Sequence, residues 1–303
     1  MSWSLPGERP ARRTAAPGEP TLALPGPSGD PRPLPSAELL AGWPRFAEVE
    51  LAGRGGMGRV YRARDRRDGR VVAVKLLIER RHENDELREA RLQARVEHPA
   101  VLPVLDHGHV GGFPWFSMPY VTGAPLKTAR RGMALGEALA LVREVCHALA
   151  AVHAKGIVHC DVNPRNVLIG RSAAGLRAWL IDFGIAGEPR RGRSLPRPFG
   201  TPAYMAPEQA LRSPGQLDPR TDVYGLGATL YEIAAGRQPF PAATCEAMIT
   251  RALCEEPEPL AEIAPDVPRG LDPIVRRCLA KEPADRYPGV VALAAELERL
   301  IAN

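Results

Sequence analysis

The sequence predicts an α+β protein in which a strand-rich part precedes a helix-rich part. Short apolar runs at residues 46–52, 60–64 and 71–77 are separated by glycine or Asp-Gly turns, which is typical of antiparallel strands. A helix is expected at 85–96, followed by strands at 101–105 and 115–118. From residue 136 onwards apolar residues recur at helical spacing. We expect one domain with a small β-rich lobe at 43–120 and a larger helical lobe at 121–303.

The composition is that of a globular chain. Of 303 residues, 45% are hydrophobic and 25% carry charges of both signs, for a net charge of +5, so a dedicated nucleic-acid binder is not expected. The sequence shows no run of 18 apolar residues and no apolar signal core, which predicts no membrane span and a cytoplasmic location. Five cysteines without paired spacing indicate reduced thiols.

Two further biases stand out. Residues 1–42 are rich in proline, glycine, arginine and alanine, which predicts a disordered or polyproline-like tail. This tail is either a docking segment for a partner or a solvated segment without a specific ligand.

The basic residues of the chain are nearly all arginine, so each lysine calls for a specific reason. The lysines are Lys75, Lys127, Lys155 and Lys281.

A glycine-rich loop joins the first two predicted strands. Residues 53–60 read Gly-Arg-Gly-Gly-Met-Gly-Arg-Val. Because a strand follows the loop, the dinucleotide-binding fold is excluded, since its glycines open a helix. Glycines let backbone amides approach phosphates without a Cβ in the way. Alone, the pattern is weak, because glycine loops are common.

Lys75 ends an otherwise apolar strand, a position where lysine is rare unless it is paired. Glu89, fourteen residues later, is the candidate counter-ion, although it also fits an exposed helix charge. Lys75 could then reach phosphates.

Further along, Pro119 and Val121 lie in a connector that ends at Gly123. Backbone groups of this connector could pair with a flat heterocycle.

The central polar loop is residues 159–166, between an apolar helix and an apolar strand. Asp161 could orient and deprotonate a nucleophile while Asn166 holds a metal, and an ordinary turn is the alternative. Asp182, which emerges from an apolar strand before Phe-Gly, is a second metal-ligand candidate. Later in the chain, Asp222 is expected to pair with loop amides, and Arg286 with Glu208.

Together and in this order, these motifs resemble those of eukaryotic-type Ser/Thr protein kinases of the soluble bacterial kind, over residues 46–300. The resemblance implies a bilobal protein-kinase fold. It rests on the glycine loop, the strand ending in Lys75, the loop from Asp161 to Asn166, and on Asp182-Phe183-Gly184, Ala206-Pro207-Glu208, Asp222 and Arg286.

The resemblance also implies roles. Lys75, held by Glu89, would position the α- and β-phosphates of ATP, and Asp161 would accept the proton of the substrate hydroxyl. Asn166 and Asp182 would hold two Mg²⁺ ions, with Mn²⁺ as an alternative, and Thr201 would sit beside Asp161. The implied ATP-binding residues are Leu51, Gly53, Arg54, Gly55, Gly56, Met57, Gly58, Arg59, Val60, Ala73, Lys75, Met118, Pro119, Val121 and Leu168.

Two positions depart from the family pattern. Most Ser/Thr kinases have a lysine two residues after the catalytic aspartate, where this chain has Asn163. Arg165 stands where many tyrosine kinases place an arginine, and we hypothesise that it supplies the missing cation. Cys160 replaces the arginine that usually pairs with a phosphate on the activation segment, so activity is expected to depend little on phosphorylation there. A redox-sensitive Cys160 is the alternative to an inert thiol.

The resemblance favours an active kinase acting on Ser or Thr of protein substrates, with autophosphorylation included. A pseudokinase that binds nucleotide as a scaffold is the alternative, and Asn163 is the feature that favours it. A small-molecule kinase conflicts with the peptide-substrate segment at residues 200–208. Tyrosine specificity stays open because of Arg165, although residues 200–202 favour Ser/Thr.

Overall fold

The structure is a computed structural model that describes residues 42–55, 58–78, 87–173, 175–187, 200–211 and 217–302. All of the described residues lie in the unit Pro35–Asn303. The predictions for the tail, for Gly56 and Met57 and for residues 188–199 lie outside the described residues.

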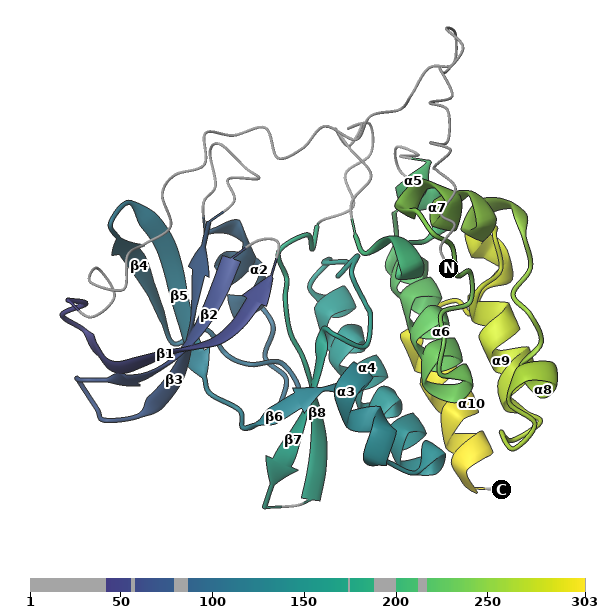
Figure 1. Ribbon diagram of the computed structural model, residues 1–303, viewed down its shortest axis with the longest axis horizontal. Helices are drawn as coiled ribbons and strands as arrows, with labels where there is room; N and C mark the ends of the chain where they lie inside the picture. Colours follow the sequence, from purple (N-terminus) through teal and green to yellow (C-terminus); the bar gives the residue numbers. More distant parts are fainter. Residues whose placement is uncertain are drawn as a thin grey trace, which may run out of the picture. The chain divides into compact units, whose positions relative to one another are not determined.

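A five-stranded antiparallel sheet forms the first lobe (Figure 1). Its spatial order is β1-β2-β3-β5-β4, and the elements are β1 (Phe46–Gly55), β2 (Gly58–Asp65), β3 (Val71–Leu77), β4 (Asp106–Val110) and β5 (Phe113–Pro119). The glycine loop joins two antiparallel strands, and Gly55 pairs with Gly58 across the hairpin. The predicted hairpin is therefore confirmed, with both strands longer than expected.

The register of the sheet puts two sets of side chains on its two faces. Val60 lies opposite Lys75, and Ala73 lies opposite Met118, so these four side chains share one face. The opposite face packs into a separate apolar cluster that includes Trp43, Phe46, Tyr61, Val74 and Trp115. One face of the sheet is therefore covered by this apolar cluster, and the other face carries Lys75.

The strand predicted at residues 101–105 is wrong. Val101 forms only an isolated parallel bridge with Leu180, and the strand that pairs with β5 is β4. Pro103 interrupts the apolar run, and proline cannot donate a hydrogen bond to a sheet. The apolar character of Val101 and Leu102 reflects their burial in the core. The segment that pairs with β5 through its backbone is the more polar β4, which follows them in the chain.

The helix of this lobe, α2 (Arg88–Ala94), is shorter than the predicted 85–96. Its expected first residues, 85 and 86, lie outside the described residues. The helix ends at Ala94, although Val96 is buried. The apolar spacing that extended the prediction therefore reflects the burial of Val96 in the chain that follows the helix.

The second lobe combines a three-stranded sheet with helices (Figure 1). The sheet contains β6 (Gly123–Pro125), β7 (Val167–Ser172) and β8 (Gly175–Leu180), and the helices are α3 (Leu126–Ala129), α4 (Leu135–Ala154), α5 (Pro207–Ala210), α6 (Pro219–Ala235), α7 (Cys245–Cys254), α8 (Leu260–Ile263), α9 (Leu271–Cys278) and α10 (Val290–Ala302). Short 3-10 turns occupy Arg130–Gly132, Pro202–Tyr204 and Pro283–Asp285. Across the described ranges, no helix has the length and apolar character that crossing a bilayer requires.

Helix α6 is almost entirely buried and packs against the central polar loop, residues 159–166. A Cβ added at Gly225 would stand 2.7 Å from the carbonyl oxygen of Val162, which is tighter than a real side chain tolerates. Gly225 therefore allows the helix to lie directly against the loop that carries Asp161 and Asn166. The helical pattern of α4 and α6 was predicted from sequence, and this close approach was not.

Candidate active site

Lys75 connects the sheet of the first lobe with Asp182 of the second. Its Nζ lies 2.6 Å from Glu89 Oε1 and 3.0 Å from Asp182 Oδ1. Its side chain is 8% exposed and that of Glu89 is 6% exposed, so the pair is shielded from water. The ion pair expected between strand β3 and helix α2 is thus confirmed, and Asp182 is an additional partner.

The electrostatics of this cluster favour the charged forms of Lys75 and Asp182, whereas burial raises the pKa of Glu89 above its usual value. Burial alone would lower the pKa of Lys75, but the attraction of Glu89 and Asp182 outweighs it and raises that pKa well above its usual range. Burial likewise acts to raise the pKa of Asp182, and the charge and hydrogen bond of Lys75 lower it below its usual value. The site therefore presents an ammonium and a carboxylate side by side.

Asp161 is held at both carboxylate oxygens. The Thr201 N–H donates to Oδ1 at 2.9 Å, and Asn166 Nδ2 donates to Oδ2 at 2.8 Å. Asn166 also donates to the carbonyl of Asp161 at 2.9 Å. The predicted base, its neighbouring amide and Thr201 are therefore brought together, and the orientation of the carboxylate is fixed by its neighbours.

The loop of Asn166 is tied to the strand that leads into Asp182. The N–H of Ile181 donates to the carbonyl of Asn166 at 3.0 Å, which brings the two predicted metal ligands together. Asp182 has a φ of 69°, in the left-handed region that non-glycine residues seldom occupy. Its carboxylate accepts the N–H of Gly184 at 3.2 Å, which stabilises this turn.

Asp222 supports the loop from helix α6. Its carboxylate accepts the backbone N–H groups of His159 at 2.9 Å and Cys160 at 2.8 Å, and lies 2.7 Å from Nε2 of His153. The prediction that Asp222 is a buried carboxylate bonded to loop amides is confirmed. The contact also holds Cys160 at a φ of 64°.

Four of the residues predicted to surround the nucleotide, Val60, Ala73, Lys75 and Met118, lie on the lysine face of the sheet. Ala73 and Met118 belong to one apolar cluster, against which Val60 and Val121 pack. Leu51 is 43% exposed on β1. Leu168 lies on β7, and the remaining described members are in the hairpin or connector: Gly53, Arg54, Gly55, Gly58, Arg59 and Pro119.

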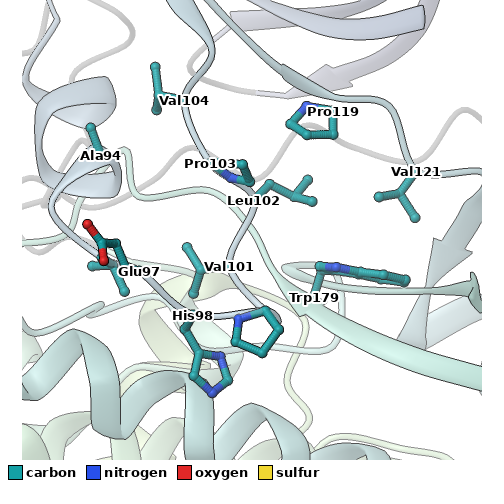
Figure 2. Close-up of a pocket in the computed structure, with 12 residues that line it drawn as sticks. Ala94, Glu97, His98, Val101, Leu102, Pro103, Val104, Pro119, Val121 and Trp179 are labelled. Carbon is teal, nitrogen blue, oxygen red and sulfur yellow. The ribbon is translucent and has the colours of Figure 1, made fainter. Parts of the chain in front are cut away.

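A cavity of about 670 Å³ lies beside the connector (Figure 2). Val101, Leu102, Pro119, Val121 and Trp179 are among its lining residues. None of the predicted catalytic or metal-binding residues lines it. Pro119 and Val121, two of the predicted ATP-binding residues, do line it, so the cavity borders the connector side of the predicted nucleotide site.

The two departures from the family pattern have distinct surroundings. Asn163 is buried, and its amide donates to the Asp161 carbonyl at 3.0 Å and to Thr201 Oγ1 at 3.4 Å, while its oxygen accepts the Arg165 N–H at 3.0 Å. Asn163 is thus a structural brace of the loop. Burial raises the pKa of the Cys160 thiol far above its usual value, so the thiol stays protonated and the expectation of an inert thiol is supported.

Arg165 is exposed, and its side chain forms no hydrogen bond or ion pair with any described residue. The structure therefore places a free cation beside the catalytic loop, without bringing it into contact with Asp161.

Glu208 and Arg286 form the predicted ion pair. Arg286 Nη1 and Nη2 lie 2.8 and 2.9 Å from the two Glu208 oxygens, in bidentate geometry. Sequence reasoning missed Gln209, whose amide donates to the Cys160 carbonyl at 2.8 Å. It also missed the partner of Lys127, which is Glu232. The scarcity of lysine was a usable signal for Lys127, and no local pattern indicated its partner.

Comparison with known proteins agrees with this geometry. The family profile described as protein kinase domain matches residues 46–296. The chain belongs to the protein kinase family. Proteins of this family use ATP and a divalent metal ion.

The relatives are bacterial kinases. The chain is 39% identical over 279 residues to the DNA damage-responsive serine/threonine-protein kinase RqkA of Deinococcus radiodurans, covering 88% of this chain and 40% of the relative. It is 37% identical over 267 residues to the serine/threonine-protein kinase pkn2 of Myxococcus xanthus, covering 84% and 32%. The chain therefore spans less than half the length of these curated relatives.

A solved structure shares the fold. A double mutant of the Mycobacterium tuberculosis PknI kinase domain superposes with a TM-score of 0.66 at 29% identity, covering 84% of this chain and 96% of that chain. The bilobal kinase fold expected from the sequence is therefore confirmed.

The donor set at the site fits a divalent metal bound together with phosphates. Asp182 supplies a carboxylate and Asn166 an amide oxygen, and Mg²⁺ is usually bound by one or two carboxylates completed by waters and phosphate oxygens. The described residues contain no group of three or more His, Cys, Asp or Glu side chains arranged for a metal. A site with two protein ligands, Asp182 and Asn166, agrees with the usual coordination of Mg²⁺ and with the lack of a larger ligand cluster among the described residues.

Removing the charge of Arg286 should destabilise the second lobe. In Arg286→Met, Glu208 stays buried without its cation, which costs about 3–5 kcal/mol of unfolding free energy. Arg276→Met is the matched control, because its pair with Asp272 is partly exposed and contributes about 0–1 kcal/mol. Urea denaturation of both variants tests this; equal losses in the two would contradict it.

Proposed function

We propose that this protein is an active protein kinase that transfers the γ-phosphoryl group of ATP, with Mg²⁺ or Mn²⁺, to Ser or Thr hydroxyls of protein substrates. The observation that carries the proposal is the convergence of Lys75, Asp161, Asn166 and Asp182 at one site. The similarity to bacterial Ser/Thr kinases supports the substrate class.

Each of these side chains has a distinct task. Lys75, already charged and fixed by Glu89, binds phosphate oxygens. Asp161, oriented by Asn166 and the Thr201 N–H, accepts the proton of the attacking hydroxyl. Asn166 and Asp182 would hold the divalent ions, which would neutralise charge on the transferred phosphoryl group.

The scaffold alternative is a pseudokinase that binds nucleotide without turnover. Its support is the loss of a lysine at position 163. Against it, Asn163 braces the loop and Arg165 offers a cation next to it. We also propose a cytoplasmic location, because the five cysteines have no disulfide spacing.

The decisive experiment follows labelled phosphate from ATP to a generic protein substrate and identifies the modified residue by phosphoamino-acid analysis. We expect phosphoserine or phosphothreonine from the native protein. Asp161→Asn should lower the rate about 10²–10⁴-fold, because it removes the base, while nucleotide binding persists. Nucleotide binding without transfer by the native protein would establish the scaffold alternative, and phosphotyrosine would contradict the substrate class.

Arg165 should contribute to the chemical step. If it replaces the missing lysine as a phosphate-directed cation, Arg165→Ala should lower kcat by about ten- to thousand-fold, with the KM for ATP retained. Arg165→Lys is the matched variant, since it keeps the charge, and it should restore part of the loss. Steady-state kinetics measure both, and an unchanged kcat in Arg165→Ala refutes the assignment.

Activity should depend little on phosphorylation of the activation segment. Cys160 cannot bind a phosphate as arginine does. Ser194 and Thr201 are the only Ser or Thr residues between Asp182 and Glu208 in the sequence, and Ser194 lies outside the described residues. Ser194→Ala should therefore retain activity within about two-fold. Mass spectrometry of the native protein, with the same assay, checks this; an inactive variant speaks against it.

A further inference from the structure

Helix α3 begins directly beside the catalytic loop. The backbone N–H of Lys127 donates to the carbonyl of Pro164 at 2.9 Å, three residues after Asp161. The side chain of Lys127 then reaches Glu232, with Nζ 2.7 Å from Oε1. One of the four lysines in the chain is thus fixed by its backbone to the loop that carries the base.

Glu232 is engaged at both oxygens. Oε1 bonds Lys127, and Oε2 accepts the hydroxyl of Tyr204. Tyr204 follows by three residues Thr201, whose N–H binds Asp161. Lys127, Glu232 and Tyr204 therefore form a polar network that flanks Asp161 on two sides, through Pro164 and through Thr201. A substrate chain that brought its hydroxyl to Asp161 would come close to Pro164 and Thr201, and through them to this network.

The charges around this network are mainly positive. Arg165 is exposed and close enough to Tyr204 to affect its hydroxyl electrostatically. Arg130 donates from Nε to the carbonyl of Ile233, next to Glu232, at 2.9 Å. The single carboxylate of the network is already neutralised by Lys127, so the residual field favours an acidic side chain over a basic one.

The contribution of the Lys127–Glu232 ion pair to the stability of the fold is a weak explanation for a lysine at this position. The side chain of Lys127 is 34% exposed, and ion pairs that are open to water contribute about 0–1 kcal/mol. The side chain of Glu232 is 11% exposed, so without Lys127 it would be an incompletely paired carboxylate beside the substrate path. Such a group attracts the lysine or arginine of a peptide.

We propose that Lys127 is a specificity-determining residue, which occupies the Glu232 carboxylate and thereby favours Ser/Thr substrates with acidic rather than basic side chains next to the acceptor. The proposal rests on the proposed kinase function. The lysine acts as an internal substitute for a basic substrate residue, so a basic peptide must compete with it for Glu232. An acidic peptide meets Arg165, whose side chain has no ion-pair partner among the described residues, without such competition.

The test uses the full chain and three peptides with the same Ser/Thr acceptor, flanked on both sides by Glu, Gln or Arg. Fluorescence anisotropy measures binding, and phosphate transfer from labelled ATP measures turnover. We expect the native protein to bind the Glu peptide about five- to ten-fold more tightly than the Arg peptide. Lys127→Met should reverse this ratio because it frees Glu232, and Glu232→Gln should increase the preference for Glu.

Two matched variants serve as controls. Lys127→Arg keeps the charge and should keep the preference. Lys155→Met removes an exposed lysine at the other end of helix α4, about 30 Å along its axis, and should leave the ratio unchanged. Thermal unfolding of each variant identifies any that fails to fold. If Lys127→Met fails to fold, the question is decided by comparing the Glu-to-Arg binding ratio of Glu232→Gln with that of the native protein.

Binding and turnover separate the two proposals. Preferential binding of the Glu peptide without transfer to any peptide supports the specificity assignment and refutes the kinase activity. Transfer with equal or preferential use of the Arg peptide supports the kinase activity and overturns the role of Lys127. An unchanged ratio in Lys127→Met also overturns it.

Discussion

The buried charge of Lys75 is the constraint on which the rest of the structure depends. An ammonium group removed from water is unfavourable unless anions surround it. Glu89 on helix α2 and Asp182 after strand β8 provide them at 2.6 and 3.0 Å. Three elements distant in sequence are thus required to meet at one point.

The same principle organises the second lobe around Asp222. This carboxylate is fully surrounded, and it accepts backbone N–H groups of the loop that positions Asp161. Burial acts to raise the pKa of Asp222, but the hydrogen bonds and charge of the histidines around it, His153 and His159, lower it. Gly225 on the same helix removes the side chain that would hold the loop away. A rigid helix therefore sets the geometry of a loop that carries the chemistry.

The departures at positions 160 and 163 are accommodated by hydrogen bonds within the loop and with the residues next to it. A cysteine and an asparagine replace two cations, and both are buried and hydrogen-bonded. Arg165 lies in the same loop as Asp161, and Lys127 is bonded to that loop through its backbone N–H and the carbonyl of Pro164. If the roles proposed for Arg165 and Lys127 hold, these two cations would connect catalysis with substrate choice.

The sequence alone determined the order of the motifs, the glycine hairpin and the amphipathic helices, because spacing and periodicity are local properties. It also indicated Lys75–Glu89 and Glu208–Arg286 as candidate ion pairs, before the family resemblance was considered. Only the tertiary structure decided that residues 101–105 form no strand and that Lys127 pairs with Glu232, 105 positions later. Burial and long-range ion pairing depend on which surfaces meet in space, and no local pattern records that.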